Sequence, residues 1–276
     1  MSVRPGNGRK RKDPAAAKAR KAGLLRRTGR TAIGVSSDVG GMAIIVGRSL
    51  AALLPPRIEP AGMVRGMYRF GVQSIPLVVA TAFLTGVVVL LMAAVHVRQY
   101  GATVLVGWAS GYATFRELGP VLIAIMFSGR VGSNNTAELA VMKVTDQLEA
   151  LRALAIDIYA YLIIPRLFAM VVVLVGLTLL GNLLAIIGAA VAADSLIGVS
   201  YPVFWNSFTT YVRIEDLLHG LVKAGVFGLA IAVVSCHFGL SARGGAAGVG
   251  RAVNRSVVAS AIIIFLLDYL LTHTLT

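Results

Sequence analysis

Long apolar stretches alternate with short charged segments along most of the chain. Four of these stretches are long enough to cross a bilayer as helices, which takes about 20 residues. They cover residues 74–97, 159–193, 217–240 and 254–275, and none holds more than two Asp, Glu, Lys or Arg residues. A fifth stretch, about 102–128, is interrupted by the adjacent charges Arg116 and Glu117. The pattern therefore predicts five helical spans.

The distribution of Lys and Arg between the loops supports the fifth span. With five spans and the amino terminus inside, ten basic residues after the first 30 fall on the inner side, and only Arg98 and Arg213 fall outside. Omitting the 102–128 span would move Arg130, Lys143 and Arg152 to the outer side. Because inner loops of membrane proteins are enriched in Lys and Arg, this asymmetry predicts a cytoplasmic amino terminus and an outer carboxyl terminus.

The composition agrees with an all-α integral membrane protein. The 276 residues are 57% hydrophobic and 14% charged, and the mean hydropathy is +0.80. The single cysteine, Cys236, excludes an internal disulfide, and the four scattered histidines have no metal-site spacing. The sequence thus indicates neither redox nor metal chemistry.

The first 40 residues read as a basic, disordered cytoplasmic tail. Residues 1–30 hold eleven Lys or Arg and one Asp, but no aromatic residue that could stack on a base. A tail of this kind, placed before membrane spans, favours contact with anionic headgroups over nucleic acid. The permease domain would then be 41–276, and it would begin with an interfacial helix at about 41–70, since the apolar stretch there is broken by Arg48 and by Pro55-Pro56.

Residues 137–154 predict an amphipathic cytoplasmic helix between the second and third spans. Val141, Val144, Leu148 and Leu151 recur at helical spacing, and the charged residues lie mostly off that stripe. The periodicity fits two interpretations equally: a helix lying on its own membrane, or a docking surface for a cytoplasmic partner.

The charged pair inside the second span is the strongest candidate for a functional feature. Charges in hydrocarbon are costly and usually face a bundle interior or a wet cavity, so Arg116 and Glu117 suggest a transport pathway. The alternative is a shorter span with the pair anchored at its outer interface. Pro120 removes a backbone hydrogen bond and is expected to kink this helix. For Asp268, near the outer end of the last span, we favour the interfacial anchor.

No nucleotide site is recognisable in the chain. The segment from Gly245 to Gly250 has the glycine spacing of a phosphate-binding loop, but Arg251-Ala252 replaces the Lys and Ser or Thr that would hold phosphate and magnesium. Ser, His and Asp occur in no recognised catalytic arrangement. We therefore expect a transport subunit with no catalytic residues, rather than an enzyme.

Several long motifs occur in a fixed order: RELGPVL, GRVGS, AEL and MKVT within residues 115–145, then GVGRAVNRSVVAS and DYLLT, with GVQSIP and FLTG in the first span. In these motifs the chain resembles the MlaE/YrbE permease family, the membrane subunits of ABC-type lipid transporters associated with MCE proteins. The resemblance runs from about Gly47 to Thr274.

The resemblance implies an interfacial helix, five spans, a cytoplasmic coupling helix and a lipid pocket shared with a second permease copy or a paralogue. It places lipid contacts at Val89, Val97, Tyr100, Arg116 and Glu117. It favours docking over membrane contact for 137–154, with six polar coupling residues: Glu138, Lys143, Asp146, Gln147, Glu149 and Arg152.

The implied partners are a cytoplasmic ABC ATPase, which would bind ATP and magnesium, an MCE-domain protein and a small STAS-type accessory subunit. This chain would hold no cofactor. The implied location is the bacterial inner membrane, and the implied function is movement of phospholipid or another hydrophobic lipid across the envelope.

Two positions depart from the family. Met92 stands where relatives commonly have Gln, and Asn134-Asn135-Thr136 stands where small apolar residues are usual. Two other functions remain: an ion-coupled secondary transporter of an amphiphile using Arg116, Glu117 and Asp268, and a scaffold without transport. The chain shows no inverted repeat of the kind that carriers have.

Overall fold

The computed structural model describes residues 33–49, 51, 60–99, 101 and 103–275. Their secondary structure is helical, with connecting turns and no strand in the described part. The chain divides into two units, residues 1–44 and residues 45–276. In the first unit the described residues, 33–44, are helical. Most of the predicted tail and the middle of the predicted interfacial helix lie outside the described residues.

The helix that holds the first span begins before the predicted span. Helix α2 (Pro60–Gly71) continues through η1 (Val72–Ser74) into α3 (Ile75–Gln99), and the run over residues 62–97 contains a stretch apolar enough to cross a membrane. Residues 60–70, assigned above to the interfacial helix, are helical, and their place at the membrane interface stays a prediction. Helix α2 packs on the third span through its glycines: a β-carbon at Gly66 would lie 3.2 Å from that of Ala169.

The predicted second span is part of a long, interrupted helical run. It comprises α4 (Val106–Ala113), the π-helix η3 (Thr114–Leu118), α5 (Gly119–Phe127), the π-helix η4 (Ser128–Gly132) and α6 (Ser133–Val144). Pro120 lacks the backbone N–H that a regular α-helix needs, and the first π segment ends just before it. Four of the described helical stretches meet the length and hydropathy of a membrane span, and this run is not among them. That this run crosses the membrane therefore stays a prediction.

The remaining spans lie near their predicted positions. Helix α8 (Ile164–Ala192), with η5 (Tyr159–Ile163) before it and η6 (Ala193–Ile197) after it, forms the third, and α10 (Ile214–Leu240) and α11 (Gly245–Leu275) form the last two. Between the third span and α10 lies α9 (Tyr201–Tyr211), a short helix that the sequence did not predict. Pro202 at its start and the left-handed Gly198 before it mark the turn from the third span.

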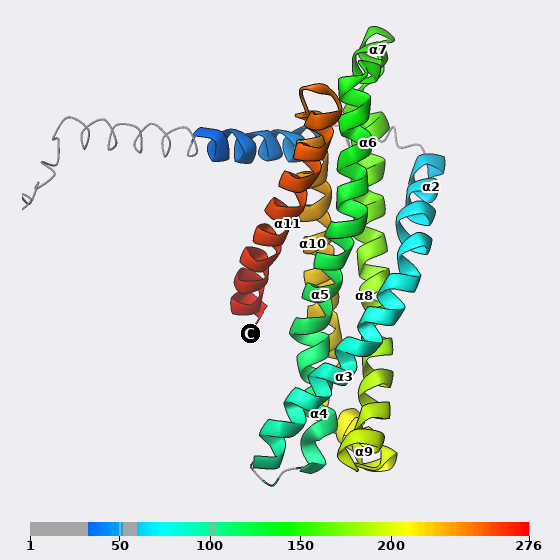
Figure 1. Ribbon diagram of the computed structural model, residues 1–276, viewed down its shortest axis with the longest axis vertical. Coiled ribbons are helices and arrows are strands. Elements are labelled where there is room, and N and C mark those ends of the chain that lie inside the picture. The colour runs from blue at the N-terminus through cyan, green and yellow to red at the C-terminus, as the bar shows by residue number, and fades with distance from the viewer. Residues whose placement is uncertain (1–32, 50, 52–59, 100, 102, 276) are drawn as a thin grey trace, which may run out of the picture. The chain divides into compact units, whose positions relative to one another are not determined.

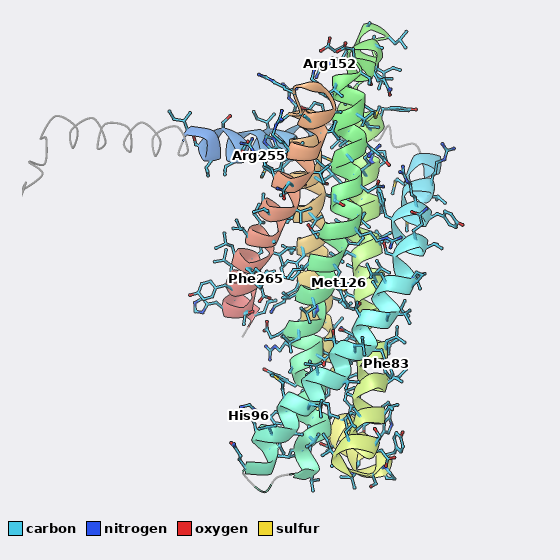
Figure 2. All side chains as sticks on the ribbon, in the orientation of Figure 1. Phe83, His96, Met126, Arg152, Arg255 and Phe265 are labelled. Carbon is cyan, nitrogen blue, oxygen red and sulfur yellow. The ribbon has the colours of Figure 1, made fainter. Side chains whose placement is uncertain are left out.

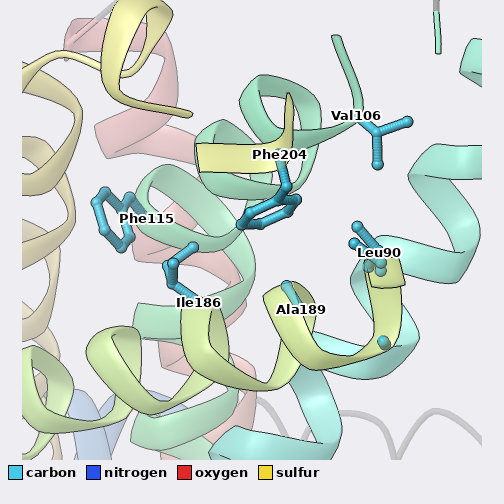
Figure 3. Packing of buried hydrophobic residues seen from close by; sticks show 8 residues of the cluster. Leu90, Val106, Phe115, Ile186, Ala189 and Phe204 are labelled. Atoms are coloured by element: carbon cyan, nitrogen blue, oxygen red, sulfur yellow. The ribbon is translucent and has the colours of Figure 1, made fainter. Parts of the chain in front are cut away.

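Helix α8 is the central element of the bundle, because it contacts α2, α3 and α10 along its length (Figure 1). It approaches α3 so closely that neither Gly86 nor Gly188 has room for a β-carbon next to the facing backbone. One buried apolar cluster joins α3, α4, η3, α8, η6 and α9, and Figure 3 labels six of its members: Leu90, Val106, Phe115, Ile186, Ala189 and Phe204. This cluster fixes the end of the bundle at which α3 turns into α4.

The amphipathic segment is not one helix, as the sequence predicted for 137–154. Helix α6 ends at Val144, Asp146 takes a left-handed conformation at φ 60°, and a separate helix, α7 (Gln147–Ala153), follows. The hydroxyl of Thr145 donates to the Val141 carbonyl at 2.8 Å in the last turn of α6. A non-glycine residue at positive φ ends a right-handed helix, so the periodic stripe is carried by two helices at an angle.

Candidate functional site

An apolar cavity of about 740 Å³ lies against α3, α4 and α5. Its wall holds one face of α3 between Thr81 and Val97, together with Ala109, Ala113, Leu118 and Leu122. Val89 and Val97, the apolar residues implied as lipid contacts, both line it. Tyr100 lies outside the described residues. The cavity is thus formed by the first span and the interrupted run, where the resemblance placed a lipid pocket.

The polar side chains of this wall are Thr81, Thr85 and His96. The Thr81 hydroxyl donates to the Leu77 carbonyl at 2.7 Å, so its hydrogen is used within α3. His96 lies near the end of α3 (Figure 2), and its Nδ1 is 2.9 Å from the Met92 carbonyl oxygen. Met92, the first departure from the family pattern, is exposed on the wall and keeps it apolar.

Arg116 and Glu117 do not line the cavity and do not neutralise each other. Arg116 donates to the Tyr112 hydroxyl at 2.8 Å and to the Leu275 carbonyl at 3.2 Å, and it lies 3.7 Å from the Asp216 carboxylate. Its guanidinium also stands over the Tyr112 ring. Adjacent positions on a helix point about 100° apart, so the two side chains reach different helices.

Glu117 instead joins a buried cluster centred on Lys223 of α10. The Lys223 ammonium donates to Glu117 at 2.6 Å, to Asp268 at 2.9 Å and to the Thr272 hydroxyl at 2.7 Å. The Lys223 side chain is 1% exposed. Asp268 is therefore an ion-pair partner in the bundle and not the interfacial anchor favoured above. Two carboxylates and one hydroxyl as acceptors explain how a lysine is kept inside a membrane bundle.

The sequence reading missed Lys223, although a signal was present. Lys223 is the one Asp, Glu, Lys or Arg in the predicted span 217–240. A lone charge of that kind predicts a buried partner, and Glu117 and Asp268 were the available acids of neighbouring spans.

A second polar cluster explains the Asn134-Asn135-Thr136 departure. Asn135 and Thr136 are fully buried. The Asn135 amide donates to the Ser235 hydroxyl at 2.8 Å, and its oxygen accepts from Arg166 at 2.5 Å. Thr136 donates to the Ser256 hydroxyl, also at 2.8 Å. Polar residues here join α6 to α8, α10 and α11.

Known proteins of similar sequence identify the family. The profile of the family described as permease MlaE matches residues 63–274. The chain belongs to the MlaE permease family. A probable ABC transporter permease protein of Rickettsia felis is 32% identical over 245 residues, which is 89% of this chain and 95% of the relative. A probable ABC transporter permease protein of Synechocystis is 35% identical, covering 83% and 87%. The intermembrane phospholipid transport system permease protein MlaE of Haemophilus influenzae is 31% identical, covering 76% and 81%.

This MlaE-family chain is a multi-pass membrane permease, as the resemblance implied. The residues assigned to coupling separate into two groups. Glu138 faces inward, where it pairs with Arg69 and, at 3.1 Å, with Arg166. Glu138 thus forms ion pairs between helices of the bundle, and it does not belong to the exposed polar surface at α7. Arg166 consequently joins both of its polar neighbours, Glu138 and Asn135.

The other coupling residues lie around the junction of α6 and α7. Lys143 and Glu149 form an ion pair across the junction, with 3.0 Å between nitrogen and oxygen. The Lys143 hydrogen bond and charge lower the pKa of Glu149. Asp146, Gln147 and Arg152 are exposed, and Figure 2 places Arg152 at the end of the bundle opposite His96.

Proposed function

We propose that this permease moves phospholipid or another hydrophobic lipid across the cell envelope, as the membrane subunit of an ABC-type transporter that works with an MCE-domain protein. The observation that carries the proposal is the apolar cavity of about 740 Å³ beside the first span. Acyl chains suit such a wall because each buried methylene contributes roughly 0.8 kcal/mol. The relative from Haemophilus influenzae is itself named for intermembrane phospholipid transport.

Energy would come from a separate cytoplasmic ABC ATPase that binds ATP and magnesium. Its docking surface would be the junction of α6 and α7, whose exposed polar residues offer hydrogen bonds and charges of both signs. A second permease copy or a paralogue would close the cavity from the other side, and a small STAS-type subunit would accompany the ATPase. The orientation would be that of the loop charges, with the amino terminus cytoplasmic and the carboxyl terminus outside.

An ion-coupled carrier is the rival function. Such a carrier needs a carboxylate that can bind and release its cation. Glu117 and Asp268 are both held by Lys223, at 2.6 and 2.9 Å, and Asp216 lies near Arg116. If one of these carboxylates left its basic partner to bind a transported cation, the buried Lys223 or Arg116 would lose an ion pair. This favours a structural role for the pairs over a transport site.

The test is reconstitution of the permease with its ATPase and MCE-domain protein in vesicles that contain a fluorescent phospholipid. We expect lipid movement that requires ATP and stops when the ATPase carries an inactive nucleotide site. The permease alone should hydrolyse no ATP. Lipid movement driven by an ion gradient in the absence of the ATPase would establish the rival function.

Filling the cavity gives a sharper readout in the same assay. Leu84 lines the cavity and is 61% exposed, so Leu84→Trp should occupy the space of an acyl chain while leaving the bundle core intact. Leu183 on α8 is similarly exposed, at 55%, and does not line the cavity. Leu183→Trp is therefore the matched control. Equal transport by the two variants would remove the cavity from the proposed path.

A further inference from the structure

A second cavity, of about 540 Å³, lies at the other end of the same two helical runs. Its wall is mostly polar, in contrast to the apolar cavity. Six polar side chains line it: Arg69, Gln73, Ser74, Arg130, Ser133 and Asn134.

Positive charge is in excess around this polar pocket. Glu138 is the carboxylate that pairs with Arg69, and it also pairs with Arg166 at 3.1 Å. Arg130 is exposed and has no ion pair among the described residues. One carboxylate therefore pairs with two of the three guanidinium groups in this region, and Arg69 and Arg130 line the pocket. An anion in the pocket would balance this charge.

The neighbouring groups favour an oxygen-rich anion. A guanidinium binds phosphate oxygens through paired N–H donors. The Gln73 side chain has no hydrogen-bond partner among the described residues and can add its amide N–H groups. The Asn134 amide is 3.5 Å from Glu138, a distance at which it remains available to a closer acceptor.

The position of the pocket indicates which phosphate it would meet. Residues 69–74 precede the core of the first span, and residues 130–137 follow the core of the second, on the side that the loop charges predict to be cytoplasmic. Along α3 the two cavities are separated by residues 74–81, and along α5 by residues 122–130. At 1.5 Å per residue these separations are roughly 10 to 12 Å, which is less than half of the ~30 Å hydrocarbon core. A single lipid of the inner leaflet is long enough to reach both.

We propose that the polar pocket binds the phosphate of an inner-leaflet lipid headgroup, while the acyl chains of that lipid enter the apolar cavity. This inference rests on the proposed function, because it concerns the same lipid. It assigns the headgroup contact to Arg69 and Arg130, which the sequence reading did not single out, and leaves Arg116 to its contacts within the bundle.

The experiment uses the full-length permease in dodecyl maltoside micelles that contain either palmitoyl-oleoyl phosphatidylglycerol or palmitoyl-oleoyl glycerol, which has the same chains without phosphate. Native mass spectrometry counts the lipid molecules retained on the protein. We expect preferential retention of phosphatidylglycerol, and about tenfold less of it in Arg130→Gln, which loses a charged hydrogen bond. Arg130→Lys should restore part of the loss.

Two further variants control for charge and folding. Arg243 is exposed and lies outside the pocket, so Arg243→Gln should retain lipid as the parent does. Gln73→Leu removes a neutral contact from the exposed rim and should weaken retention without disturbing an ion pair. Equal retention by the parent, Arg130→Gln and Gln73→Leu would overturn the proposal.

Two other results would also overturn it. Displacement of phosphatidylglycerol by excess inorganic phosphate would assign the pocket to a free anion. Equal retention of the two lipids would show that the phosphate is not recognised. Either result, combined with normal ATP-driven transport in the reconstituted complex, would reject the headgroup site and leave the proposed function standing.

Discussion

Lys223 of α10 donates a 2.6 Å hydrogen bond to Glu117, a residue 106 positions earlier in the π-helix between α4 and α5. Asp268 of α11 accepts from the same ammonium group at 2.9 Å. The lysine thus connects three helical segments that are distant in the sequence. Because Lys223 is almost fully buried, the pairing determines how these segments can move relative to one another.

Replacing Lys223 with Met should destabilise the protein by about 3 kcal/mol, since it leaves two carboxylates facing each other without their cation. Thermal unfolding in detergent measures this loss. The triple variant Lys223→Met, Glu117→Gln, Asp268→Asn removes all three charges and should recover most of the stability. An unchanged unfolding temperature in the single variant would mean that the two acids are solvated or protonated, and that the ion pairs contribute little.

Much of the architecture could be predicted because bilayer spans depend on local composition. The four apolar stretches are helices near their predicted positions, and residues 74–97 needed no knowledge of neighbours. The continuation of this helix into α2 could not be predicted in the same way. It depends on Gly62, Gly66 and Gly71 meeting α8, and a contact with a helix 100 residues away has no local signature.

Part of the cavity wall could be named from the family motifs, and its role as a lipid site stays a prediction. Val89 and Val97 were placed by motif and do line the cavity. The partners of Arg116 and Glu117 could not be predicted, because adjacent side chains on a helix point in different directions and their partners depend on three-dimensional packing. The polar triplet at 134–136 likewise had no explanation until Arg166 and Ser235 were seen opposite it.

Gly86→Ala should destabilise the bundle by roughly 1–3 kcal/mol, the usual cost of overpacking. A β-carbon there would collide with the backbone carbonyl of Ala185, and backbone atoms cannot move aside as a flexible side chain can. Gly176→Ala is the control within α8, because nothing lies within 4 Å of its β-carbon position. It should be neutral or slightly stabilising. Thermal unfolding of the two variants separates these outcomes, and equal stability would mean that α3 and α8 can move apart.

Asn135→Leu should cost about 1–3 kcal/mol, because Arg166 and Ser235 each lose one buried hydrogen-bond partner. Asn254 is exposed, so Asn254→Leu tests whether a polar-to-apolar change alone has an effect. Urea or thermal unfolding provides the measurement. Higher stability of Asn135→Leu would indicate that the family's usual apolar residues pack better here, and that the polar cluster serves another purpose.

The ion pair between Lys143 and Glu149 should make the junction of α6 and α7 sensitive to acid. The pKa of Glu149 is lowered from 4.5 in the folded protein, so its contribution is present above the unfolded pKa and is lost as the pH falls through the folded value. Amide hydrogen exchange of α7 should therefore rise below about pH 4.5 more than that of α10. Glu149→Gln should show no such pH step, and a step that persists in this variant would assign it to another group.

Reversing the charges of Asp146 and Glu149 to Lys should weaken association with the ATPase while leaving membrane insertion intact. Both residues are exposed at the junction of α6 and α7. The short helix α7 lies beyond the spans, where a cytoplasmic partner could reach it. Asp194 and Glu215 are exposed acids of the opposite end, where the helix of the third span ends and that of the fourth begins, so their double reversal is the matched control. A quantitative pull-down with the purified ATPase should show weaker binding for the first double variant and parental binding for the control.

Since Glu149→Lys also breaks the pair with Lys143, the single variant Asp146→Lys, which breaks no ion pair, should show an intermediate loss. Parental binding by all three variants would mean that 137–154 lies on its own membrane, and that the ATPase engages another part of the permease.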